Sequence, residues 1–513
     1  MDRWEPRGTM AARGRLAVRV LLAACGGWAC IPADAAPLLA GVARVEITDR
    51  EAGPVHDPAF VTAIVFDDGT TRAAVVAVDA VAIGGIGRIG DGYLPRVRAE
   101  LSAELGIPPG NLLVNASHCH AAVRGDTDLL TVQAVRQAWA AREPVAVGCG
   151  TAREDRISEN RRVRLVGGGE ADMRRAYPLP ADAEVAGVGP IDSQVGILRV
   201  DRLDGRPLAV LYSFACHPIM NPPARGSSAD FPGVAAQVVE EALGEGCLAV
   251  FVQGCGGDVN PIRYKETRVP PDAEPLGTML GATVLAGRRA IEVAPDATLA
   301  AARTALELPR ADDYERRIEA IEAERAALVA GLRSTNVNFK SFLPLYLAGG
   351  LDPEFPTHHA QATLRDRGVG REDLPQMAAE GRRQVEDYLH NIRAMERLTR
   401  LNTNLALLRM HQEQTRRAGD TPLVVEVCGL RVGDFRLVTF PGELTVEVGL
   451  AIKERSGMPH AFVAGYTNGY IYYTPTESQR RNPDYAQEDC DTLVAPGWQQ
   501  RFESRALEIL RGL

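Results

Sequence analysis

The chain has 513 residues, of which 46% are hydrophobic and 24% are charged, the balance of a soluble globular enzyme with room for more than one core. Its formal net charge of -9, without a basic block in the sequence, gives no electrostatic reason to expect nucleic acid as a partner. Aromatic residues make up 5% of the chain, too few to favour a stacking platform for single strands.

The N-terminal residues have the pattern of a secretory signal peptide. Several arginines precede a short apolar segment at 20–31, and Ala33-Asp34-Ala35 follows it. A basic region, a short apolar run and an Ala-x-Ala site are typical of a cleaved signal, and the run is too short to span a bilayer. We expect cleavage after residues 1–35, a mature domain at 36–513, and a secreted or periplasmic protein. A lipoprotein processed at Cys25 ranks second, because very little apolar sequence precedes that cysteine.

Seven cysteines remain after such a cleavage, at positions 119, 149, 216, 247, 255, 428 and 490. An odd number requires at least one free thiol, and none of them forms the Cys-x-x-Cys pair of a structural zinc knuckle. Cys119, Cys216 and Cys255 stand beside the motifs described below. We interpret these three as small buried residues near a site, with a disulfide between two of them as the alternative.

The first part of the mature chain predicts sheet followed by helix. Two β-rich runs, 61–66 and 72–81, are joined by Asp67-Asp68-Gly69-Thr70, and Asp-Gly between such runs is a hairpin signal. Apolar residues recur at helical spacing over 94–105 and predict an amphipathic helix. The apolar run 112–114 then predicts a short buried strand.

Two histidines follow this strand, in the hexapeptide Asn115-Ala116-Ser117-His118-Cys119-His120. If the strand continues through the pair, His118 and His120 point to the same face, because side chains alternate along a strand. The two imidazoles could be two metal ligands, one ligand and one general acid/base, or two hydrogen-bonded surface histidines. The hexapeptide alone leaves all three interpretations open.

The next elements repeat this design, in which a strand ends in a polar residue. They are strands at 196–200 and 208–214, a helix from 230 to about 243, and a strand at 248–252. The second strand runs into Ala215-Cys216-His217-Pro218, and the last one runs into 253–261, which contains Asp258 and Asn260. Three glycines in this segment allow the backbone to bend sharply and to approach a ligand closely.

Residues 311–412 change in character and predict a helical insertion. The segments 314–332 and 376–411 carry Glu, Arg, Ala and Leu at helical spacing. The link at 334–370 contains several prolines and glycines, so we expect a long loop that borders a site. The neighbouring His358 and His359 would point to opposite sides of an extended chain, so we do not expect joint ligation.

Sheet returns after the insertion, with strands predicted at 423–427, 435–440 and 461–465 and a helix at about 444–452. Glu443 falls at a strand-to-helix turn, where a helix N-terminus favours an anion. The segment 466–476 holds four tyrosines within eight residues, which is not ordinary loop composition. Together the elements predict an α/β protein with mixed sheets, flanking helices and a helical insertion.

Residues that bind metals or transfer protons thus follow several distant strands, namely His118 with His120, His217, Asp258 and Glu443. Histidine nitrogens with a carboxylate, and a position left open for water, are the composition of a catalytic zinc site. Nothing local forces these residues together. The residues alone therefore leave both a metallohydrolase and a generic secreted α/β protein open.

In its motifs the chain resembles the neutral (non-lysosomal) ceramidases and their uncharacterised bacterial relatives. The shared motifs occur in the family's order over nearly the whole mature chain: Ser117-His118-Cys119-His120, Asn160-Arg161, Ala215-Cys216-His217-Pro218, 228–233, 257–261, Pro441-Gly442-Glu443 and 468–473. The resemblance implies zinc held by His118, His217, Glu443 and a tyrosine. Tyr473 matches that tyrosine, and Tyr470 and Tyr472 are the rival candidates.

The resemblance also assigns roles around the metal. It implies that His120 and Arg161 face the scissile group, where a histidine can act as general acid/base and an arginine can hold an oxyanion. Asp258 is expected in the active site, with capping of its own backbone as the alternative. Asn260 stands where the ceramidases carry an active-site serine, so a covalent serine mechanism is excluded there, although asparagine can hydrogen-bond a substrate carbonyl.

Two further departures separate the chain from the ceramidases. Arg162-Val163 follows Asn160-Arg161 where the family has Ser-Pro, and we expect no C-terminal immunoglobulin-like domain. The sequence therefore predicts a secreted zinc-dependent amidohydrolase or esterase, with an N-acylsphingosine type of substrate by resemblance only.

Two alternatives stay open. They are a hydrolase of a non-lipid amide, ester or lactone, and a catalytically silent relative that binds a glycan or a lipid. The expected partners are a small-molecule or lipid substrate and a peripheral membrane contact, without nucleic acid.

Overall fold

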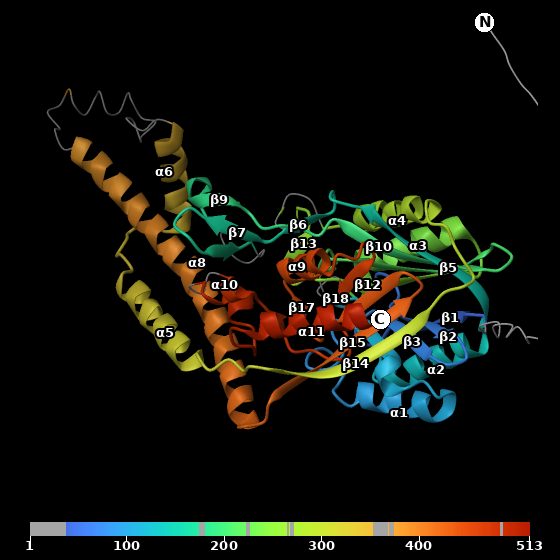
Figure 1. Ribbon diagram of the computed structural model, residues 1–513. Coiled ribbons are helices and arrows are strands. Elements are labelled where there is room, and N and C mark those ends of the chain that lie inside the picture. The colour runs from blue at the N-terminus through green and yellow to red at the C-terminus, as the bar shows by residue number, and fades with distance from the viewer. Residues whose placement is uncertain are drawn as a thin grey trace, which may run out of the picture. The chain divides into compact units, whose positions relative to one another are not determined.

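An eight-stranded mixed sheet is the centre of the fold (Figure 1). Its strands, in spatial order, are β12 (Leu248–Gln253), β11 (Pro207–Phe214), β10 (Gln194–Arg202), β5 (Glu143–Arg153), β1 (Leu39–Glu46), β2 (Phe60–Asp67), β3 (Arg72–Val78) and β4 (Leu112–Ala116). The two predicted hairpins are confirmed, because β2 pairs antiparallel with β3 and β10 pairs antiparallel with β11. Both edge strands, β4 and β12, run parallel to their neighbours.

The computed structural model describes residues 37–173, 180–221, 226–263, 266, 271–351, 368, 374–482 and 486–513. The predicted signal peptide and the His358-His359 pair lie outside the described residues. None of the helices within these ranges is long and apolar enough to cross a membrane.

A second sheet of four strands packs against one face of the first. It consists of β14 (Leu299–Leu308), β15 (Leu423–Val432), β16 (Phe435–Thr439) and β18 (Ala461–Ala464). Alternation along β2 decides which side chains face which layer, since Ile64 and Phe66 join the core between the sheets, whereas Val61 and Val65 face the helices.

Helices cover the two outer faces of this pair of sheets. On the eight-stranded sheet they are α1 (Tyr93–Leu105), α2 (Thr127–Ala140), α3 (Asp230–Leu243) and α4 (Glu274–Arg289), and on the four-stranded sheet they are α9 (Val446–Ser456) and α11 (Trp498–Gly512). The layers are therefore helix, sheet, sheet and helix, which confirms the predicted α/β class with mixed sheets.

Short elements complete the structure around the edges. They are β6 (Ser158–Asn160) paired with β13 (Val259–Pro261), β7 (Arg162–Leu165) between β8 (Glu170–Asp172) and β9 (Val185–Val188), and β17 (Glu443–Leu444) paired with β19 (Tyr473–Thr474). The short helices are η1 (Pro109–Asn111), η2 (Asp182–Glu184), α10 (Glu477–Arg480) and η4 (Gln487–Asp489).

The predicted helical segments of the insertion are present as α5 (Tyr314–Ala330) and α8 (Leu374–Ala418) (Figure 1). The prediction of a loop throughout 334–370 was wrong, because α6 (Phe339–Leu351) lies within it. Pro344 removes a backbone N–H from this helix, but Phe342 stacks on Tyr388 of α8 with ring centroids 4.6 Å apart. Tertiary packing here outweighs a local helix breaker.

The seven cysteines among the described residues are all free thiols, and six of them are buried. Cys119, Cys216 and Cys255, the three beside the motifs singled out in the sequence, are among the buried ones. Their interpretation as small packing residues is confirmed, and the alternative of a disulfide between two of them is not found.

Candidate metal centre

The predicted metal ligands come together where strands of the two sheets end. His118 follows β4, His217 follows β11, and Glu443 opens β17. Although β4 and β12 stand at opposite ends of the strand order, their C-terminal ends meet, because the backbone N–H of Gln253 donates to Oδ1 of Asn115 at 2.8 Å. The curvature of the sheet thus gathers residues that are far apart in the sequence.

The strand before the histidine pair does not continue through it, so the condition under which His118 and His120 would share one strand face is not met. β4 ends at Ala116, and His118 has a φ of 68°, in the left-handed region that bulky residues rarely adopt. Its backbone N–H donates to the carbonyl of Ala80 at 3.0 Å, which holds this turn. As a result His118 is buried, His120 is exposed, and their ring centroids are 5.7 Å apart.

Two backbone carbonyls fix the orientation of the buried histidine rings. Nδ1 of His118 lies 2.6 Å from the carbonyl oxygen of Val81, and Nδ1 of His217 contacts the carbonyl oxygen of Gly256. A carbonyl oxygen only accepts hydrogen bonds, so Nδ1 of each ring must carry the hydrogen. Nε2 of each ring is then left with its lone pair, the arrangement typical of histidines that bind metals.

Both of these lone pairs point toward one carboxylate. Oε2 of Glu443 lies 3.5 Å from Nε2 of His118 and 3.1 Å from Nε2 of His217. One ligand atom from each of the three residues lies within 4.8 Å of the others, and all three residues are buried. Two imidazole nitrogens and a carboxylate oxygen are a donor set that zinc accepts, with room for water in a fourth position. The residues present therefore fit a metal ion.

Burial and neighbouring charges favour the protonation states that a metal requires. The pKa of His118 is lowered to about 4, first by loss of hydration, so its imidazole is neutral at pH 7. Burial alone would raise the pKa of Glu443, but the two histidines and a hydrogen bond from Tyr470 hold it below its usual range. Neutral imidazoles beside an ionised carboxylate bind a divalent metal without first losing protons.

His120 lies beside this group and is also held neutral. Its pKa is lowered to about 4 by loss of hydration and by the neighbouring His118. His120 is exposed whereas His118 is buried, so water opposes the lowering of the pKa more strongly at His120. Both imidazoles are nevertheless neutral at pH 7. An exposed neutral imidazole can accept a proton.

A small pocket adjoins His120. It has a volume of about 220 Å³ and is lined by Ala80, Val81, Ala82, Gly87, Arg88, His120, Ala121, Ala122 and Val123. Apart from Arg88 and His120, the lining residues have small or aliphatic side chains. The pocket is thus a mainly apolar recess with one basic group, His120, that can exchange protons.

Two tyrosine hydroxyls hold the carboxylate of Glu443. Tyr470 donates to Oε1, and Tyr466 donates to Oε2 at 3.2 Å. Tyr466 has a φ of 52°, and its ring lies 4.4 Å from that of His118, so two strained residues pack against each other beside the ligand atoms. Backbone strain of this kind persists only where the surrounding structure compensates for it, and it is concentrated at functional sites.

Tyr473 and Tyr472, the other two tyrosines of the cluster, are placed differently. The ring of Tyr473 is stacked on His217, with centroids 6.4 Å apart and planes 9° apart. The hydroxyl of Tyr472 accepts a hydrogen bond from Gln414 of α8 at 2.9 Å. Tyr473 therefore borders the metal-ligand group, whereas the hydroxyl of Tyr472 is engaged by the helical insertion.

Arg161 lies beside His217. Its Nη1 is 3.2 Å from Oδ1 of Asn260 and 3.5 Å from Nε2 of His217, and its Nη2 donates to the carbonyl of Gly257. Its Nε donates to Glu488 at 2.6 Å. The structure therefore brings Arg161 and Asn260 together beside the metal-ligand group, with Nη1 as the guanidinium nitrogen nearest to it.

Asp258 is buried and contacts main chain and amide groups. Its carboxylate accepts hydrogen bonds from the backbone N–H of Val446, at the start of α9, at 2.8 Å and from the amide of Asn160 at 3.2 Å. Burial is the main cause that raises its pKa to about 6. These contacts agree with a capping role at the N-terminus of α9, and an active-site role stays a prediction.

Sequence reasoning did not single out Tyr466 or Glu488. Tyr466 comes two residues after the end of β18, so the strand-end rule that marked the histidines also applies to it. Glu488 lies in η4, and no local pattern distinguishes it from other acidic residues of the chain. Only the fold reveals its partner, Arg161.

Comparisons with known proteins bear on the fold. No protein-family model and no curated protein sequence matches this chain. The chain is similar to the crystal structure of neutral ceramidase from Pseudomonas aeruginosa, with a TM-score of 0.58 and 16% sequence identity, over 93% of this chain and 74% of that one. It is also similar to a structure described as ceramidase complexed with C2, with a TM-score of 0.57, 16% identity, and coverage of 93% and 75%. The chain therefore has a neutral ceramidase-like fold.

Proposed function

We propose that this protein is a zinc-dependent hydrolase of amide or ester bonds. The observation that carries the proposal is the buried convergence of two histidine Nε2 atoms and a carboxylate, from His118, His217 and Glu443. Tyr473, whose ring is stacked on His217, is the proposed fourth ligand. Zinc bound there would polarise a carbonyl group and lower the pKa of a coordinated water molecule.

His120 is the proposed group that moves protons. It is neutral at pH 7 and exposed, so it can take a proton from the attacking water and deliver one to the leaving nitrogen or oxygen. Its position beside the buried ligands, rather than among them, supports a role as reacting group.

Arg161 and Asn260 are the proposed groups that bind the carbonyl oxygen of the substrate. They contact each other at 3.2 Å, and Arg161 reaches His217. A guanidinium group and an amide can both donate hydrogen bonds to an oxygen that gains negative charge in the transition state. Asparagine lacks a hydroxyl, so the proposed reaction is direct hydrolysis by water, with no acyl-serine step at position 260.

The two ceramidase structures support an N-acylsphingosine type of substrate for this chain, and peripheral contact with a membrane would accompany such a lipid. A non-lipid amide, ester or lactone is the alternative for the same chemistry. The proposal for localisation is export with cleavage after Ala35, which N-terminal sequencing of the mature protein tests.

A screen of fluorogenic N-acyl and ester substrates tests the proposed function. We expect hydrolysis by the zinc-loaded wild type, loss of at least about 100-fold in kcat in His120→Ala, as for removal of a general acid/base, and retention of activity in His56→Ala. His56 is another exposed histidine, outside the site. Activity of His120→Ala equal to that of His56→Ala would exclude His120 from the reaction. A wild type that binds zinc and hydrolyses nothing would favour the silent binding module.

A further inference from the structure

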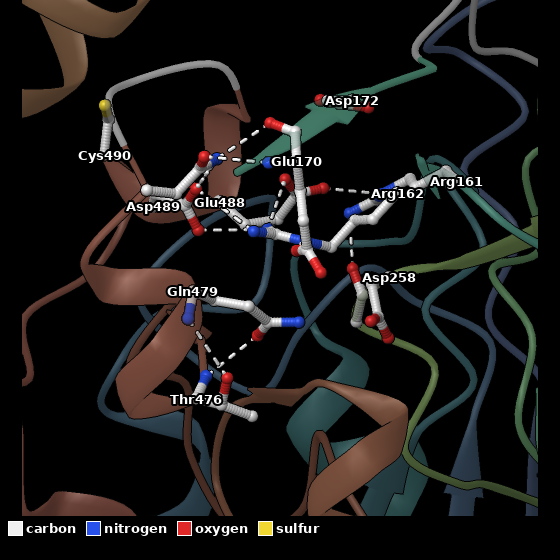
Figure 2. A network of polar contacts seen from close by, with 12 residues as sticks. Arg161, Arg162, Glu170, Asp172, Asp258, Thr476, Gln479, Glu488, Asp489 and Cys490 are labelled. Carbon is white, nitrogen blue, oxygen red and sulfur yellow. Dashed lines mark hydrogen bonds and ion pairs between the residues drawn. The ribbon is translucent and has the colours of Figure 1, made fainter. Parts of the chain in front are cut away.

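A short acidic segment joins the candidate site to the helical insertion. It comprises Glu488-Asp489-Cys490-Asp491, and Asp489 and the side chain of Glu488 are fully buried. Figure 2 shows two of its residues, Glu488 and Asp489, beside Arg161 and Arg162. Buried carboxylates are costly unless they are paired, so each of them should have a defined partner.

Glu488 and Asp489 hold two adjacent arginines. Glu488 accepts the Nε hydrogen bond of Arg161 at 2.6 Å, and the side chain of this arginine is 3% exposed. Asp489 accepts two hydrogen bonds from the neighbouring Arg162, at 3.0 and 3.1 Å. Arg161 extends toward His217, whereas Arg162 also pairs with Glu170 of β8. Arg162 Nη1 also lies 3.5 Å from Glu488, so Glu488 contacts both arginines, and of the two only Arg161 reaches the candidate site.

Asp491 connects the same segment to the metal ligands. Its backbone carbonyl accepts a hydrogen bond from the N–H of Tyr473 at 3.1 Å. Tyr473 lies in β19 opposite Glu443 of β17, and the N–H of Glu443 donates to the carbonyl of Tyr472 at 3.0 Å. The position of Asp491 therefore sets that of the strand pair that carries Glu443.

Helix α8 of the insertion holds Asp491 through His411. Nε2 of His411 lies 2.7 Å from the carboxylate of Asp491, and the His411 ring packs edge-on against Tyr472 with centroids 4.6 Å apart. His411 is completely buried. A buried, hydrogen-bonded histidine inside a long helix is a rigid contact between that helix and the site.

Helix α5 of the insertion contacts the same segment. The hydroxyl of Tyr314 donates to the carbonyl of Thr492 at 3.0 Å, and Arg317 donates to Sγ of Cys490 at 3.5 Å. Two helices that are separated in the sequence thus contact residues 490–492, and the insertion packs against the C-terminal part of the acidic segment.

We propose that Glu488 and Asp491 are positioning residues for the site, and that the helical insertion fixes them in place through His411. This inference rests on the proposed function, because it assigns to Glu488 the orientation of Arg161 toward the substrate and to Asp491 the orientation of the strand that carries Glu443. The role of the insertion is then to make the site rigid from outside the sheets.

The first experiment compares Glu488→Gln with Asp489→Asn in the full-length, zinc-loaded protein. Both substitutions remove a buried carboxylate that pairs with an adjacent arginine, so they should destabilise the fold to a similar degree. We expect kcat to fall about 10- to 100-fold in Glu488→Gln, with KM and zinc affinity within about threefold of wild type. In Asp489→Asn we expect kcat within about threefold of wild type, because Arg162 does not face His217. Thermal unfolding of both variants checks the match.

The second experiment measures zinc affinity of His411→Ala by competition with a chelator. Arg409→Ala is the matched control, since Arg409 also lies on α8 and forms an exposed ion pair with Glu322 of α5. We expect His411→Ala to bind zinc about 10-fold more weakly than wild type and Arg409→Ala to bind it within about twofold. His411→Gln, which keeps a donor for Asp491, should recover part of the loss.

Equal losses of kcat in Glu488→Gln and Asp489→Asn would overturn the positioning role of Glu488. Equal zinc affinities of His411→Ala and Arg409→Ala would overturn the role of the insertion. A wild type that binds zinc but hydrolyses no substrate would contradict the proposed function, and the zinc titrations would still decide the role of His411. A wild type that binds no zinc would contradict both.

Discussion

Removal of the Tyr470 hydroxyl should weaken metal binding although His118, His217, Glu443 and Tyr473, the proposed ligands, all remain. In Tyr470→Phe the ring stays, but Oε1 of Glu443 loses its hydrogen bond while Oε2 still faces the two histidines. The hydroxyl of Tyr466 still donates to this carboxylate. We expect the carboxylate to rotate more freely and to bind the metal less well.

The size of this effect follows from the contact that is lost. A hydrogen bond to a charged acceptor contributes about 1.5–3 kcal/mol to stability. Part of this energy is lost in both the metal-free and the metal-bound protein, and that part does not change the metal affinity. Loss of a contact that orients a metal ligand typically weakens metal affinity about 10- to 100-fold. We therefore expect a 10- to 100-fold increase in the zinc Kd of Tyr470→Phe, which corresponds to about 1.4–2.7 kcal/mol.

Tyr472→Phe provides the matched control, since it also removes one tyrosine hydroxyl from the same segment. That hydroxyl accepts a hydrogen bond from Gln414 and does not contact Glu443. Zinc affinity, measured by competition with a fluorescent chelator, should change less than about twofold in this control, because the ligands keep their contacts. Equal affinities of Tyr470→Phe and wild type would refute the view that the tyrosines hold the carboxylate for the metal.

Three further predictions concern stability and pH. Arg162→Ala should lower the unfolding free energy by about 3–5 kcal/mol in urea denaturation, because the buried carboxylate of Asp489 loses the arginine of its ion pair and keeps a neutral donor, the amide of Asn482. Trp498→Ala should cost about 3–5 kcal/mol in the same assay, since the indole is fully buried and donates to the carbonyl of Pro475 at 2.8 Å. Chiefly because of burial, the pKa of Asp258 is raised from 3.8 to about 6, so the folded state holds this proton more tightly than the unfolded chain does. The stabilisation that this raised pKa contributes is complete below about pH 4 and is lost as pH rises through 6. The wild type should therefore lose unfolding free energy between pH 4 and pH 7, and Asp258→Asn should reduce this loss by on the order of 3 kcal/mol. An equal loss in both proteins would contradict the raised pKa of Asp258.

The sequence predicted the fold class and the strand ends near which the candidate ligands lie, because both depend on local patterns. Apolar runs such as 208–214 mark buried strands, and His217 comes three residues after this one. Strand ends of one sheet gather at the same edges, so residues placed there meet in space. The motif resemblance supplied the grouping of His118, His217 and Glu443, which the fold brings together.

Other features depended on contacts that the sequence does not encode locally. The turn at His118 is set by the carbonyls of Ala80 and Val81, so the periodicity of a strand could not predict how the histidine pair divides. Helix α6 contains a proline and is packed against α8 through Phe342, a contact between segments that are distant in the sequence. The pairing of Arg161 with Glu488 likewise joins distant residues.

We propose that His118, His217 and Glu443 hold a metal that hydrolysis requires. The most direct measurement is the zinc content per chain of purified wild type and of His217→Ala, determined by elemental analysis after dialysis. We expect close to one zinc per wild-type chain and a large loss in His217→Ala, since only two of the three ligands remain. Zinc content unchanged by this substitution, or full activity of metal-free wild type, would contradict the claim.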